Sequence, residues 1–93
     1  MLAVSLVMKK GLEKSNNPRD VIGIEILNGN ICKKLSVSTI YKFLKNNPDV
    51  QIGIKGCNAY LVTAESINGV GYIRSAPNLS TVDSLMRLPR SNV

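Results

Sequence analysis

The sequence contains no histidine and no tryptophan, and its 93 residues include only one phenylalanine and three tyrosines. Histidine is both the commonest base near neutral pH and the commonest neutral ligand of zinc. Its absence therefore removes the usual centre of acid–base and zinc chemistry. No phosphate-binding loop, dinucleotide fingerprint or nucleophile motif is present either. The sequence thus predicts no metal ion and no cofactor, and it favours a protein that is not an enzyme.

Cysteine is scarce, because Cys32 and Cys57 are the only two in the chain, and neither stands in a spacing typical of metal ligands. We favour two free, partly buried thiols, and a disulfide between them is the alternative. Cys57 follows Lys55 and Gly56, and a nearby positive charge can lower the pKa of a thiol. A cysteine-dependent activity at Cys57 is therefore one hypothesis, and a small buried apolar side chain is the other.

Long apolar runs are also missing. Residues 1–8 are apolar, but they are too few to cross a membrane, and lysines follow them rather than precede them, unlike in a signal peptide. The sequence therefore predicts a cytoplasmic protein without membrane contact. Leu2, Val4 and Leu6 alternate with smaller residues, which favours a β-strand within residues 1–14, and a short amphipathic helix is the alternative.

Acidic residues are few, because 12 lysines and arginines stand against 6 aspartates and glutamates, for a net charge of +6. The excess is spread evenly, since residues 1–20, 21–70 and 71–93 each carry a net charge of +2. A diffuse charge favours weak attraction to polyanions, but it is not the clustered footprint of a dedicated nucleic-acid binder. Nucleic acid is therefore a weakly supported partner.

A chain of 93 residues predicts one domain, with an apolar segment and a loop in residues 1–20 and the core in residues 21–89. Residues 21–27 predict a strand whose core face consists of Ile22, Ile24 and Ile26. Asn28-Gly29 is a hairpin signal, and residues 30–35 then return as a second strand. Lys33 and Lys34 on that strand indicate either an edge protected by charge or a phosphate site.

Residues 36–46 predict the main helix, with Ser36 or Ser38 as its N-cap. Its apolar stripe consists of Val37, Ile40, Tyr41 and Leu44. Further strands are predicted over residues 49–54 and 59–63 and, after the turn at Asn68-Gly69, over 70–75. The sequence therefore predicts an α+β fold: an antiparallel, meander-like sheet of four or five strands, one main helix packed on it, and a short C-terminal helical turn.

The closing stretch, residues 71–89, joins a strand, a turn and an apolar tail. Ser80-Thr81 can cap a helical turn, and the residues that would share its apolar face are Val82, Leu85, Met86 and Leu88. We expect this tail to fold back and close an edge of the sheet.

The same stretch resembles the C-terminal signature of a family of small, mostly bacterial domains of unknown function. Members of that family end in a tyrosine–aliphatic–arginine–serine or threonine strand, a turn, and a leucine-proline pair. The matching residues here are Tyr72, Ile73, Arg74, Ser75, Pro77, Asn78, Leu85, Leu88 and Pro89. The chain departs from the pattern at Asp83-Ser84, where the family usually has two asparagines. The resemblance implies a compact α+β module and carries no activity.

Six side chains are candidates for a binding surface, and these are Arg74, Lys33, Lys34, Lys55, Tyr60 and Tyr72. Arg74 either bonds tail carbonyls or Asp83 within the fold, or recognises a phosphate or carboxylate of a partner. Tyr60 and Tyr72 lie on successive strands and are candidates for cross-strand neighbours. If they are exposed beside Arg74 and Lys55 they form a small stacking platform, and otherwise they pack beneath the helix or the tail.

The function that we favour is a small, non-enzymatic interaction module that binds a protein partner or a second copy of itself. The apolar segment at residues 1–8 and the lack of catalytic groups support it. A weak nucleic-acid-binding module with a basic face is the second hypothesis, and the cysteine-dependent activity at Cys57 is the third.

Overall fold

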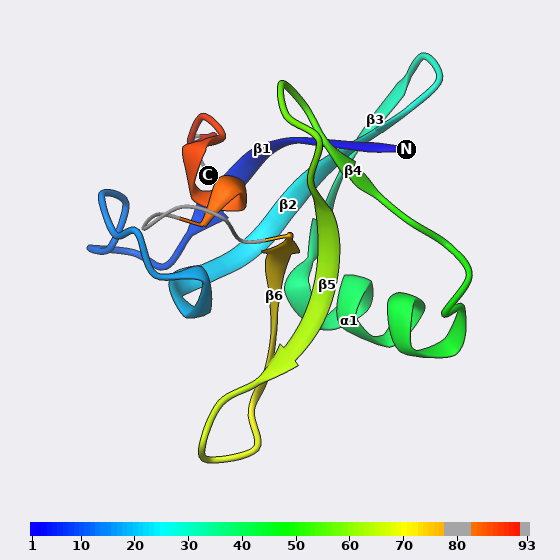
Figure 1. Cartoon of the computed structure of the whole chain (residues 1–93). Helices are drawn as coiled ribbons and strands as arrows, with labels where there is room; N and C mark the ends of the chain where they lie inside the picture. The colour runs from blue at the N-terminus through cyan, green and yellow to red at the C-terminus, as the bar shows by residue number, and fades with distance from the viewer. Residues whose placement is uncertain (78–82, 92–93) are drawn as a thin grey trace.

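The computed structural model describes residues 1–77 and 83–91, and this part of the chain forms one sheet of six strands with one main helix (Figure 1). The strands are β1 (Leu2–Met8), β2 (Val21–Asn28), β3 (Ile31–Ser36), β4 (Gly53–Ile54), β5 (Tyr60–Glu65) and β6 (Gly71–Ala76). The helix α1 spans Val37–Asn46, and two 3₁₀ turns are η1 (Pro18–Asp20) and η2 (Ser84–Arg87). The predicted α+β class with one main helix is confirmed.

The predicted meander of four or five antiparallel strands is wrong. The strand order is β3-β2-β1-β4-β5-β6, and β1 pairs with β4 in parallel, with Leu2 opposite Gly53 and Ala3 opposite Ile54. The N-terminal segment is therefore a central strand and not a helix. Ala3, Leu6 and Met8 are buried, and a central position buries more of the apolar surface of β1 than an edge position would. The alternation of residues along the chain does not reveal which position the strand takes.

The hairpin of β2 and β3 forms where the sequence predicts it. Asn28 pairs with Ile31, and Gly29 takes the positive φ of +63° that the tight turn needs. The predicted core face is only partly right, because Ile24 and Ile26 are buried whereas Ile22 is 44% exposed. A register shift next to the Met8–Val21 pair turns Ile22 out of the core, as expected for a β-bulge.

Helix α1 agrees with its predicted bounds and cap. The Ser36 side chain accepts a hydrogen bond from the backbone N–H of Thr39, which satisfies one of the free donors of the first turn. The buried residues of the helix are Ile40 and Leu44, and Val37 and Tyr41 pack against the same core. The predicted apolar stripe is thus confirmed.

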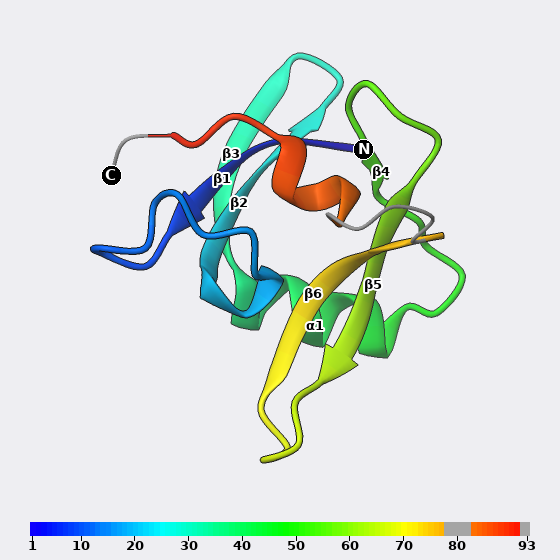
Figure 2. The same ribbon diagram turned by 60° about the vertical axis from the view of Figure 1, so that its left-hand side comes forward.

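The tail folds back onto the sheet, as predicted, but it does so through β1 as well as β6. The backbone of Leu6 donates to the carbonyl of Pro89 at 2.9 Å and accepts from the N–H of Ser91 at 2.7 Å. Figures 1 and 2 both show the tail running along β1. Leu85, Met86 and Leu88 are buried. The predicted roles of Asn78, Ser80, Thr81 and Val82 lie outside the described residues.

Candidate functional site

The six candidate side chains come from separate parts of the sheet. Lys33 and Lys34 lie on β3, whereas Tyr72 and Arg74 lie on β6, and these are the first and last strands of the described sheet. Lys55 lies in the turn between β4 and β5, and it is exposed. The order of the strands therefore gives no support to a single basic face with a stacking platform, which the nucleic-acid hypothesis needs.

Tyr60 and Tyr72 lie on the same face of the β5–β6 hairpin but are not directly opposite each other. Tyr60 pairs with Ala76 and Tyr72 pairs with Ala64, and Arg74 lies in the row between the two pairs. Both tyrosines and Arg74 are half-buried. The expected cross-strand tyrosine pair is therefore absent, because the register of the hairpin places the two rings at opposite ends of the strands.

Arg74 makes a local bond and does not reach Asp83. Its Nη1 donates to the carbonyl oxygen of Ser75 at 3.2 Å. Asp83 instead binds Ser75, whose backbone N–H donates to Oδ1 at 3.0 Å and whose hydroxyl donates to the same oxygen. The Asp83 carboxylate also accepts from the N–H of Leu85 and so caps η2. The N-cap of η2 is therefore Asp83.

Arg90 is the arginine that holds the tail. Its guanidinium donates to the carbonyls of Met86 and Leu88 in the tail at 2.8 and 2.9 Å. It also donates to the carbonyls of Glu13 and Ser15 in the loop that follows β1. Five donors in a rigid fork suit one arginine to several carbonyls at once. This residue has a structural role that spacing in the sequence did not suggest.

Strand β3 lies at an edge of the described sheet, with β2 as its neighbour, and five of its six residues are exposed, the exception being Leu35. Asn28 and Ile31 close a two-residue turn, so they form a hydrogen-bonded pair. In an antiparallel ladder such pairs alternate. The backbone N–H and C=O of Cys32 therefore point away from β2, toward the outer edge.

A groove lies on one face of β2 and β3. It has a volume of about 200 Å³, and it is lined by Met1, Ile26, Asn28, Ile31, Lys33 and Leu35. Three of these, Ile31, Lys33 and Leu35, alternate along β3 and therefore share a face. Ile31 is 61% exposed. The sequence pattern indicated Lys33 as a candidate. It did not indicate Ile31 and Leu35, two positions before and after Lys33, although the three residues alternate along the strand.

The opposite face of the same strands carries a small polar cluster. Ser5 and Cys32 both donate to the carboxylate of Glu25, and Lys34 lies opposite Glu25 in the ladder. These two hydrogen bonds, with the charge of Lys34, hold the pKa of Glu25 below its usual value. Desolvation and the neighbouring carboxylate raise the pKa of the Cys32 thiol, which makes Cys32 a poor nucleophile.

Cys57 is exposed in the turn between β4 and β5, as is Cys32 on β3, and both are free thiols. The predicted free thiols are therefore confirmed, but their predicted partial burial is wrong. The Sγ of Cys57 lies 3.8 Å from the carbonyl oxygen of Ile54 as a weak donor. Residues 1–77 and 83–91 hold no group of three or more acidic or cysteine side chains placed to bind a metal ion.

Comparison with protein families, with curated proteins and with solved structures finds no match to this chain. The resemblance of the closing stretch to a bacterial family of unknown function stays a prediction. Within the described ranges, no helix has both the length and the apolar character needed to cross a membrane.

Proposed function

We propose that this chain is a small, non-enzymatic interaction module that binds a protein partner at the outer edge of β3. The observation that carries the proposal is that edge strand with its groove. β3 offers outward-facing backbone groups at Cys32, and a groove with apolar walls lies beside it. An edge strand can take up an extended peptide, in which main-chain hydrogen bonds supply affinity and side-chain pockets supply specificity.

A partner of different sequence fits this edge better than a second copy of the chain. In an antiparallel pairing of two β3 strands, outward-facing residues must lie opposite outward-facing residues. Only two such registers pair five residues of the strand. One puts Lys33 opposite Lys33 of the second copy, and the other puts Lys34 opposite Lys34. Like charges directly opposite each other destabilise a strand pair, so these lysines oppose self-association through β3.

The proposal is tested by selecting peptides that bind the purified chain from a library of random extended sequences. We expect selected peptides to shift the backbone amide NMR signals of residues 31–36 more than those of α1. We also expect Ile31→Ser to weaken binding about tenfold, because the groove loses an apolar wall. Ile67→Ser is the matched control, since Ile67 is fully exposed on the β5–β6 turn. The proposal is refuted if the selected peptides bind only at sites other than β3, or if they bind equally well to the Ile31→Ser and Ile67→Ser variants.

The other two hypotheses have less support. Lys33 and Lys34 lie on one edge strand and Arg74 on the other, which does not favour a nucleic-acid surface. The thiol of Cys57 makes one weak hydrogen bond, to a backbone carbonyl, which gives no support to a cysteine-dependent activity. The two free thiols fit the cytoplasmic location that we propose.

A further inference from the structure

We infer that the partner segment adds to β3 as an antiparallel strand that carries an acidic residue with an aliphatic residue two positions to either side. The acidic residue lies opposite Lys33, and the aliphatic residues lie opposite Ile31 and Leu35. This inference rests on the proposed function, because it names the ligand of the same edge.

The geometry of the ladder sets the spacing. Residues 31, 33 and 35 direct their backbone bonds to β2, so toward an added strand they form the non-hydrogen-bonded pairs. Side chains in such pairs stand closest, with Cβ atoms about 4.5–5.5 Å apart. The partner residues opposite them therefore repeat every second position and point to the same face. The partner residues in between exchange backbone hydrogen bonds with the outer edge, Cys32 included.

The groove sets the chemistry of those positions. Lys33 carries the one cationic side chain among the groove residues, and no acidic side chain lines the groove. A partner carboxylate opposite Lys33 therefore gives this lysine an opposite charge that the groove residues do not supply. Ile31 and Leu35 flank Lys33 on the same strand, so aliphatic side chains opposite them bury apolar surface on both sides of the carboxylate.

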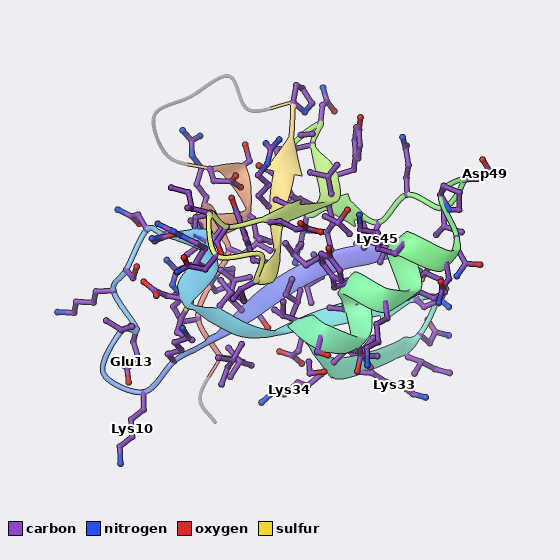
Figure 3. All side chains as sticks on the ribbon, turned by 90° about the horizontal axis from the view of Figure 1, so that it is seen from below. Lys10, Glu13, Lys33, Lys34, Lys45 and Asp49 are labelled. Atoms are coloured by element: carbon purple, nitrogen blue, oxygen red, sulfur yellow. The ribbon has the colours of Figure 1, made fainter. Side chains whose placement is uncertain are left out.

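The opposite face of β3 does not favour a second acidic residue in the partner segment. Lys34 lies opposite Glu25, and that carboxylate already meets the charge of Lys34. The acidic preference therefore belongs to the face of Lys33. Figure 3 shows the side chains of Lys33 and Lys34 leading away from the sheet edge in different directions.

The test uses two synthetic peptides of about nine residues, the length of an ordinary strand. Both have valine–threonine–X–threonine–valine at their centre, where X is aspartate in one and lysine in the other. Fluorescence anisotropy measures the binding of each to the full chain. We expect the aspartate peptide to bind about tenfold more tightly. With the Lys33→Glu variant we expect the preference to reverse in favour of the lysine peptide.

Lys10→Glu is the control, because it changes the net charge by the same amount on an exposed residue that lies far from Lys33 in Figure 3. It should leave the preference for aspartate in place. If Lys33→Glu does not reverse the preference, or if Lys10→Glu does so as well, the inference is overturned. Library peptides that bind β3 without an acidic preference would overturn the inference alone, whereas binding nowhere at β3 overturns the proposed function too.

Discussion

Replacing Asp83 with alanine should loosen the joint between the tail and β6. Asp83 is only 7% exposed, and its carboxylate accepts from three donors: the backbone N–H and the hydroxyl of Ser75, and the N–H of Leu85. Alanine leaves all three without this acceptor. The Ser75 hydroxyl in turn accepts from the N–H of Ser84 at 3.1 Å, so the loss spreads along a connected network.

The expected cost follows from these contacts. Loss of an aspartate N-cap costs about 1 kcal/mol, and a hydrogen bond to a charged acceptor contributes about 1.5–3 kcal/mol. The losses are not additive within one network, because water can enter and the Ser75 hydroxyl can rotate. We therefore expect Asp83→Ala to lower the free energy of unfolding by about 3–4 kcal/mol. A domain of this length has about 5–14 kcal/mol in total, so the variant should still fold.

Urea unfolding followed by circular dichroism at pH 7 measures this loss by linear extrapolation. In thermal unfolding the same loss corresponds to a Tm lower by about 12–30 °C. Asp49→Ala is the control, because Asp49 is an exposed loop carboxylate, and its effect should stay within about 0.5 kcal/mol. A loss of less than about 1 kcal/mol for Asp83→Ala would refute the reasoning, because it would mean that the buried carboxylate is not what secures the tail.

Three further substitutions test other contacts. Gly71→Ala should lower the free energy of unfolding by about 1–3 kcal/mol, because a Cβ there would lie 2.7 Å from Cε2 of Tyr41; urea unfolding unchanged from wild type would contradict this. Arg90→Met should lower it by about 2 kcal/mol and speed hydrogen exchange in residues 10–17, since the guanidinium binds carbonyls of that loop; equal exchange would argue against the link. The hydrogen bonds from Ser5 and Cys32 hold the pKa of Glu25 below its usual value in the fold, so the stabilisation is present above the usual pKa and is lost as the pH falls through the lower, folded-state pKa. Glu25→Gln should therefore cost stability at pH 7 and little at pH 2, and equal costs at both would count against it.

The parts of the fold that were predictable are those set by neighbours in the chain. A capping serine followed by an apolar stripe at helical spacing predicts α1, and Gly29 predicts the turn between β2 and β3, because both depend on interactions within a few residues. The burial of Leu85 and Leu88 could also be predicted from their spacing. In the candidate site, Lys33 on β3 could be predicted from the sequence. The groove beside it could not, because Met1, which is distant from Lys33 in the sequence, also lines it.

The misjudged parts depend on contacts between distant residues. The residues next to Arg90 give no sign of its partners, yet it binds carbonyls more than 70 positions away. Ile22 was expected in the core, and the shifted register beside Met8 places it outside. In both cases the deciding partner is brought near only when the sheet has formed, so no local pattern contains it.

The amino-acid order alone establishes a small basic chain without histidine chemistry, with one capped helix and several short strands joined by glycine turns, since these features need only local geometry. The folded chain decides which strands are neighbours. It places β1 in the middle, leaves β3 at an edge, and gives Asp83 rather than Arg74 the task of binding the tail to β6. The reason is that strand pairing and burial join residues that are far apart in the chain, and these contacts form only in the folded structure.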